Sequence, residues 1–166
     1  KDLHENSDRI FQGSIFLGDG FVLSPDEAEA MATDPKAREV LFPTINGQEL
    51  NSDPEQRPGK WAINFFDWPL ERASLHGSAF ERVERLVKPS RASDKRATRR
   101  ERWWQYAERA AGLYKGLLGR ERCFVAAITT KHLNFSAQPT RMVFTNALYV
   151  LTTDRWDHYA AVQSSI

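Results

Sequence analysis

Residues 122–153, RCFVAAITTKHLNFSAQPTRMVFTNALYVLTT, contain two apolar runs on either side of a polar segment. The runs RCFVAAITT (122–130) and MVFTNALYVLTT (142–153) are rich in β-branched and aromatic residues, which is typical of strands. The segment between them, KHLNFSAQPTR (131–141), is polar and predicts an exposed loop. This stretch therefore predicts a sheet that carries a polar loop on a rigid support.

The region before this sheet mixes strand and helix signals. IFQGSIFLGDGFVLS (10–24) predicts two short strands around a Gly18-Asp19-Gly20 turn. Ser24-Pro25-Asp26-Glu27 predicts a helix start, because the serine can cap, the proline fits the first helical position and Glu27 completes a capping box. We expect this helix to end before Pro35.

The loop-rich stretch 41–69 follows, with Asn46-Gly47 as a turn and WAINFF (61–66) as a strand. Ser78 and Glu81 form a second possible capping box, which would open a helix over FERVERLVK (80–88) before Pro89.

No proline or glycine occurs between Ala92 and Gly112, which predicts one long helix, followed by a short helical turn at LYKGLL (113–118). We expect a closing helix capped by Thr153 or Asp154. The order β, α, β, α, α, β, β, α predicts an α+β fold with small mixed sheets and several packed helices in a single domain.

Length and composition agree with one globular domain. The chain has 166 residues, with 41% hydrophobic and 27% charged residues, and a formal net charge of +1. Its single cysteine, Cys123, excludes an intrachain disulfide and, within an apolar run, is expected to be buried. No apolar stretch approaches the roughly 20 residues of a membrane span. The chain begins at Lys1 without methionine and its last helical pattern runs to Ile166 without a terminator, so we expect a piece of a longer polypeptide.

Charge is unevenly distributed along the chain. Residues 26–58 carry eight acids and three bases, whereas residues 88–102 carry seven bases and two acids. A basic pole of this kind attracts phosphate, although a solvated charged face remains the alternative. The candidate phosphate-binding residues are Lys88, Arg91, Lys95, Arg96, Arg99 and Arg100.

RRERWWQYAER (99–109) adds aromatic residues to this basic segment. As a helix, it would place Trp103 on an apolar stripe with Ala107, so Trp103 is expected in the core. Trp104 would point about 100° away and stack under Arg100.

The polar loop carries side chains that donate to or accept from base edges: Lys131, His132, Asn134, Gln138 and Arg141. An ordinary polar loop is the alternative interpretation.

Catalytic patterns are weak. Pro25-Asp26 and Asp34-Pro35-Lys36 formally match a P-D…D-x-K nuclease arrangement, but that site needs both acids on adjoining strands, and Asp26 is expected in a helix. The four histidines show no zinc-ligand spacing, and neither a glycine-rich nucleotide loop nor an Asn-Pro-Pro-aromatic tetrapeptide is present. We expect these 166 residues to be non-catalytic and to bind neither cofactor nor metal.

Several segments together resemble the target recognition domain of MmeI-like enzymes, which are type IIG/IIL restriction-modification proteins and related adenine-specific DNA methyltransferases. The resembling segments cover nearly the whole chain: FQGSIFLGDGFVLSPDEA (11–28), VLFPTINGQELN (40–51), WAINFFDWPLE (61–71), RRERWWQYAER (99–109), VFTNALYVL (143–151) and HYAAVQSS (158–165).

This resemblance implies a module of a bacterial, cytoplasmic phage-defence enzyme that reads double-stranded DNA in the major groove. An S-adenosylmethionine-dependent methyltransferase domain would precede this chain and flip the target adenine, and some relatives also carry a nuclease domain. Residues after RCFVAAITT would face the bases, which implicates Lys131, His132 and Asn134, and also Arg141. Two alternatives stay open: a docking domain that uses the acidic stretch 26–58, and a metal-dependent nuclease fragment.

Overall fold

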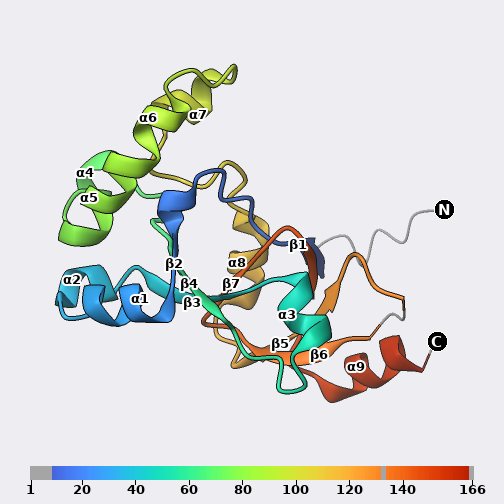
Figure 1. The fold of residues 1–166 in the computed structure, drawn as a ribbon. Helices are drawn as coiled ribbons and strands as arrows, with labels where there is room; N and C mark the ends of the chain where they lie inside the picture. The colour runs from blue at the N-terminus through green and yellow to red at the C-terminus, as the bar shows by residue number, and fades with distance from the viewer. Residues whose placement is uncertain (1–8, 132–133, 165–166) are drawn as a thin grey trace. The chain divides into compact units, whose positions relative to one another are not determined.

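The computed structural model describes residues 9–131 and 134–164 (Figure 1). The chain divides into two compact units, each assembled from segments that are distant in sequence. Unit 1 comprises Lys1–Gly13, Ile45–Pro58 and Ala110–Ile166, and unit 2 comprises Ser14–Thr44 and Gly59–Arg109. Each unit combines helices with strands, which confirms the predicted α+β class.

Unit 1 contains an antiparallel sheet with the strand order β1 (Ile10–Gln12), β8 (Leu148–Leu151), β5 (Arg122–Ala127) and β6 (Ser136–Pro139). The apolar runs at 122–130 and 142–153 thus form paired strands as predicted, and the second run also contains the short strand β7 (Val143–Phe144).

Side chains alternate across this sheet, as strand geometry requires. Cys123, Val125 and Ala127 lie in a core cluster with residues of α3 (Gly47–Ser52) and α8 (Ala111–Leu117). Phe124 and Ala126 belong to a second cluster, against which α9 (Trp156–Gln163) packs (Figure 1). Both faces of β5 are therefore buried, which explains its unbroken apolar sequence.

The predicted turn at Asn46-Gly47 is wrong, because Asn46 caps α3. Its side chain accepts from the backbone N–H groups of Gln48 and Glu49, while the Glu49 carboxylate accepts from the Asn46 backbone. Asparagine favours both turns and helix starts, and here the acid three residues later completes a capping box.

In unit 2, β4 (Lys60–Ile63) pairs antiparallel with both β2 (Val22–Leu23) and β3 (Leu41–Ile45). The helices of unit 2 are α1 (Pro25–Met31), α2 (Pro35–Arg38), α4 (Leu70–Ala73), α5 (Gly77–Leu86), α6 (Lys88–Arg91) and α7 (Ala97–Glu101), with a 3-10 turn η2 (Asp19–Phe21). The capping box at Ser24 is confirmed, whereas α5 begins at Gly77 without the predicted Ser78 cap.

The two short strands predicted within 10–24 are present as β1 and β2 with the turn η2 between them, but they do not pair with each other, because β1 pairs with β8 and β2 pairs with β4. Between them the backbone takes a positive φ at Leu17 and again at Gly18. Gly20 serves close packing, since a Cβ there would lie 2.8 Å from side-chain atoms of Leu86 and Val87.

The predicted long helix over 92–112 is also wrong. The segment forms α7, a turn, an extended stretch and then α8, which begins after Ala110 in the left-handed region. Four consecutive residues, 103–106, are buried, and no single face of a helix can hold four consecutive side chains. The structure buries them by leaving the helical conformation.

The polar side-chain groups of residues 104–106 form hydrogen bonds within unit 2. Trp104 Nε1 and Gln105 Nε2 both donate to the Trp68 carbonyl at 2.9 Å, and Tyr106 Oη donates to the Ile63 carbonyl at 2.7 Å. Within the described ranges, no helix is long and apolar enough to cross a membrane.

Candidate nucleic-acid interface

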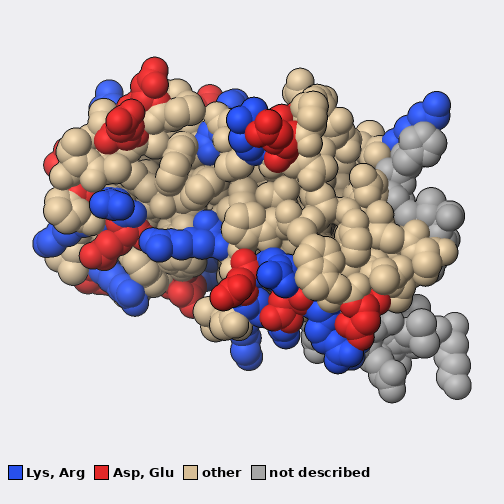
Figure 2. Space-filling model, turned by 90° about the horizontal axis from the view of Figure 1, so that it is seen from below, with Lys and Arg blue, Asp and Glu red and all other residues tan. Residues whose placement is uncertain are grey.

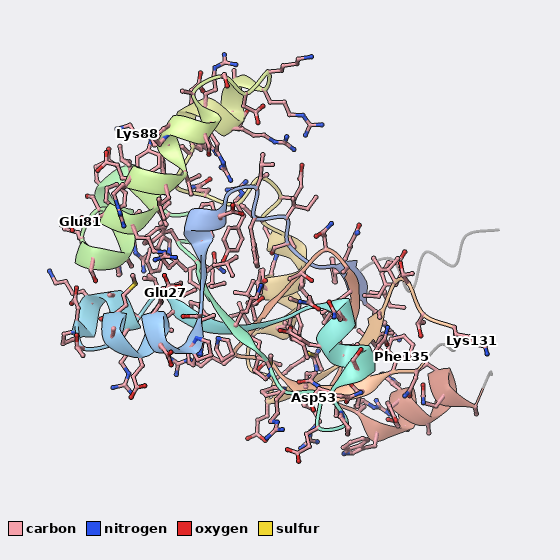
Figure 3. The ribbon with its side chains drawn as sticks, viewed as in Figure 1. Glu27, Asp53, Glu81, Lys88, Lys131 and Phe135 are labelled. Carbon is pink, nitrogen blue, oxygen red and sulfur yellow. The ribbon has the colours of Figure 1, made fainter. Side chains whose placement is uncertain are left out.

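The polar segment after β5 is divided by a strand that the sequence did not predict. β6 pairs with β5, so residues 128–135 form the connection of a hairpin. Lys131 and Asn134 are exposed on this connection, and Figure 3 shows the Lys131 side chain extending away from the ribbon. The predicted residue His132 lies outside the described residues.

Arg141 lies at the other end of β6. It is exposed and follows Thr140, whose backbone N–H donates to the Glu121 carbonyl just before β5 begins. Four residues of strand span roughly 13 Å. The structure therefore does not bring Arg141 together with Lys131 and Asn134 at one loop tip.

The end of the 128–135 connection is anchored on α9. Phe135 is buried, its backbone N–H donates to Gln163 Oε1 at 3.0 Å, and Gln163 Nε2 donates to Asn134 Oδ1 at 2.9 Å. Among the described residues no acceptor pairs with the Asn134 amide NH₂ group, so this group can donate to an outside acceptor. Gln138, in contrast, is buried and donates to the Gln56 carbonyl, so it is withdrawn from the candidate base-reading set.

The basic segment 88–102 lies in unit 2 and comprises α6, α7 and the turns around them (Figure 1). Lys95, Arg96, Arg100 and Arg102 are exposed. Lys88 is paired with Glu84 at 2.8 Å, and its ammonium lies 5.1 Å from the Trp103 ring.

Arg91 corrects the predicted phosphate-binding set. Its side chain is only 2% exposed, and its guanidinium donates to the carbonyls of Phe16, Leu17 and Gln105 at 2.5–3.0 Å. Burial lowers the pKa of Arg91 to about 10, so the group is charged at neutral pH and its charge is met by carbonyl dipoles. Four of the five N–H donors of this guanidinium are thus used within unit 2, and the side chain is buried, so Arg91 is withdrawn from the candidate phosphate-binding set.

Two acids that lie outside residues 88–102 form ion pairs with this segment. Glu84 pairs with Lys88, and Glu108 lies 3.4 Å from Arg96 and 3.6 Å from Arg99. Arg99 is also 3.8 Å from Asp94 and is about one-fifth exposed. The positive excess of this segment is therefore smaller than the sequence suggests. On a different face, seen from below in Figure 2, Asp and Glu side chains likewise lie among Lys and Arg side chains.

The two adjacent tryptophans are structural. Trp103 is buried as predicted, but Trp104 is only 8% exposed and lies edge-on against Trp103, so the predicted stacking under Arg100 is wrong. Arg100 instead donates to the Asp94 carbonyl. The indoles anchor the basic segment and offer no exposed platform for a base.

The acids of 26–58 are largely used in local structure. Backbone hydrogen bonding from Ser24, followed by the contact with Arg82, holds the pKa of Glu27 below its usual value. Backbone N–H groups of Arg57 and Glu55 lower the pKa of Asp53 in the same way. These two carboxylates therefore stabilise chain segments within their own units.

Asp26 and Asp34 are placed at helix starts. Asp26 is in the first turn of α1, and Asp34 caps α2 by accepting from the Lys36 backbone. Over residues 9–131 and 134–164, no group of three or more His, Cys, Asp or Glu side chains is arranged to hold a metal ion. Cys123 is fully buried as predicted, and burial raises its pKa to about 12.

No family model matches the sequence, and no curated protein matches it. The fold is similar to part of MmeI, a type IIL restriction-modification enzyme whose structure is known in complex with DNA. The TM-score is 0.71 at 9% sequence identity, over 93% of this chain and 20% of MmeI. The chain thus spans about a fifth of the length of that enzyme. At this identity the likeness shows a shared fold, and the chain therefore has the fold of a portion of a type IIL restriction-modification enzyme.

Proposed function

We propose that this chain is the sequence-specific, double-stranded DNA recognition module of a restriction-modification or phage-defence DNA methyltransferase. It positions DNA so that a separate domain of the parent chain, preceding this one, flips and methylates an adenine. That domain uses S-adenosylmethionine, and none of the residues described above has a role toward this cofactor. The chain itself is non-catalytic.

The observation that carries this proposal is the fold. Nearly the whole chain, 93%, superimposes on part of an enzyme that was solved with DNA bound. Protein folds host many functions, so the proposal also needs a surface whose chemistry suits DNA.

Two surfaces meet this need, one in each unit. In unit 2 the exposed cations Lys95, Arg96, Arg100 and Arg102 suit phosphate, which supplies affinity and register without sequence information. In unit 1 the exposed Lys131 and Asn134 are of the types that contact base edges.

Salt dependence tests this function directly. Fluorescence anisotropy would follow the chain binding to a labelled random-sequence duplex at roughly 50 and 200 mM salt. Four released counterions predict a loss of affinity of roughly 100-fold across this range. Absence of binding at the lower salt concentration would refute the proposal.

A control variant that loses an arginine elsewhere distinguishes a direct contact of the basic segment with DNA from the general attraction of positive charge to DNA. Arg38 is exposed on α2, and its side chain makes no hydrogen bond or ion pair within the described ranges. Arg96→Ala should weaken binding and flatten the salt dependence, whereas Arg38→Ala should leave both unchanged. Equal effects of the two substitutions would show that DNA does not contact this segment.

A further inference from the structure

A hollow lined by uncharged residues lies beside the start of the 128–135 connection. Its volume is about 380 Å³, and its walls come from the beginning of α3, the end of β5 and the β7–β8 turn. The lining residues are Asn46, Gly47, Gln48, Asn51, Thr129 and Ala147, all within unit 1.

The three walls are fastened to one another. Asn51 Nδ2 donates to the Thr129 carbonyl at 3.3 Å, and the Ile128 backbone N–H donates to the Ala147 carbonyl at 2.9 Å. A Cβ at Gly47 would lie 3.5 Å from the Ala147 carbonyl oxygen, at ordinary van der Waals distance, so the start of α3 packs beside the β7–β8 turn. The hollow and the base of the 128–135 connection therefore hold a fixed geometry.

Gln48 presents an unused carboxamide at this hollow. Its backbone N–H is engaged by Asn46, but its exposed side chain makes no hydrogen bond within the described part of the chain. Asn51 lies three residues later, on the same side of α3. A carboxamide can donate to one group and accept from another at once, which matches the N7 and N6 groups of adenine in the major groove.

The lining also indicates which part of DNA fits. It contains amides, a hydroxyl and small residues, and none of the six residues is charged. Phosphate contacts come mainly from Arg, Lys and other strong donors, whereas Asn and Gln are the side chains that pair with adenine.

We propose that Gln48, supported by Asn51, is a further base-reading residue that recognises an A·T pair next to those read from the 128–135 connection. This inference rests on the proposed function, and it adds α3 as a second sequence-reading element in unit 1. Lys131 and Gln48 then read different base pairs from one supporting sheet.

Selection from a random duplex library tests the inference. The 166-residue chain, its Gln48→Ala variant and a Ser52→Ala control would each be used to recover bound sequences, with circular dichroism to verify folding. Ser52 is exposed at the end of the same helix and does not line the hollow. Gln48→Ala should reduce discrimination at one A·T pair by roughly 5- to 150-fold. Ser52→Ala should recover the wild-type sequence.

The outcomes separate the two proposals. If the wild-type chain enriches no sequence, the proposed function fails. If the wild-type chain enriches a sequence and Gln48→Ala keeps every position of it, this inference alone is overturned. A Gln48→Ala variant that binds all sequences equally less well would place Gln48 on the DNA backbone, and would also overturn the inference.

Discussion

Replacing Arg91 should damage folding of unit 2 rather than DNA binding. The guanidinium of Arg91 joins α6 to the carbonyls of Phe16 and Leu17 on one side and Gln105 on the other. Leu17 has a φ of 52°, an unfavourable value for a leucine, and its carbonyl accepts two of these hydrogen bonds. Arg91 thus holds a strained turn in place.

The size of the effect follows from the buried groups left behind. Arg91→Met removes all four donor contacts and leaves the carbonyls of Phe16, Leu17 and Gln105 without this partner. The contact with Gln105 is buried, and those with Phe16 and Leu17 are partly buried. Leaving a buried acceptor without its hydrogen-bond partner costs about 1–3 kcal/mol. With a urea dependence of about 2 kcal/mol/M, the unfolding midpoint should fall by about 0.5–1.5 M.

Tryptophan fluorescence suits this measurement, because four of the five tryptophans lie in unit 2: Trp61, Trp68, Trp103 and Trp104.

The variant Arg91→Lys distinguishes a structural role of the guanidinium from a contact with phosphate. A lysine keeps the charge, which a phosphate contact needs, but cannot reproduce the guanidinium fork, so it should also destabilise the chain.

One result would refute this reasoning. If Arg91→Met unfolds at the wild-type urea concentration yet weakens DNA binding as much as Arg96→Ala does, then Arg91 contacts phosphate in solution. The buried network would then not be the arrangement that binds DNA.

Three further predictions concern the two surfaces and the core. Lys95→Ala and Arg96→Ala should each reduce the slope of log K against log salt by about 0.9, measured by anisotropy, and should leave the recovered sequence unchanged; a changed sequence would contradict a phosphate role. Lys131→Ala should alter the selected sequence more than the affinity for random duplex, and the reverse result would place Lys131 on the backbone. Cys123 should resist a thiol reagent near pH 8 in the native chain and react in urea. Because burial raises its pKa to about 12, the folded state keeps the proton more tightly, so the free energy of unfolding should fall as pH rises above roughly 8.5. If the urea midpoint of the wild-type chain changed over this pH range no more than that of Cys123→Ala, this prediction would be contradicted.

Elements fixed by local chemistry could be predicted from the sequence. The capping box at Ser24 and Glu27 needs only four residues, and it appears as expected. The apolar run of β5 needs only its own composition, and its burial on both faces follows from that composition. All the residues that these two predictions need lie next to one another in the sequence.

Elements fixed by distant partners could not be predicted. Trp104 and Gln105 leave the helical conformation because the Trp68 carbonyl accepts from both of them. The positive charge of the basic segment is reduced by Glu108, which lies beyond residue 102 and pairs with Arg96 and Arg99 because the chain turns after α7. The division into two units also escaped prediction, because each unit combines segments from both halves of the sequence and no linker marks the boundary.

The residues proposed to read bases occupy positions where the fold does not require a particular side chain. The core of unit 1 requires small or apolar side chains at Cys123, Val125 and Ala127, whereas Gln48 and Lys131 are exposed and contribute nothing to that core. Exposed substitutions of this kind usually change the free energy of unfolding by less than about 0.5 kcal/mol. Under the proposed function, a module of this kind can therefore acquire a new target sequence without losing its fold. Under the proposed function, the residues that read bases are those whose replacement changes the selected sequence while leaving the urea midpoint in place.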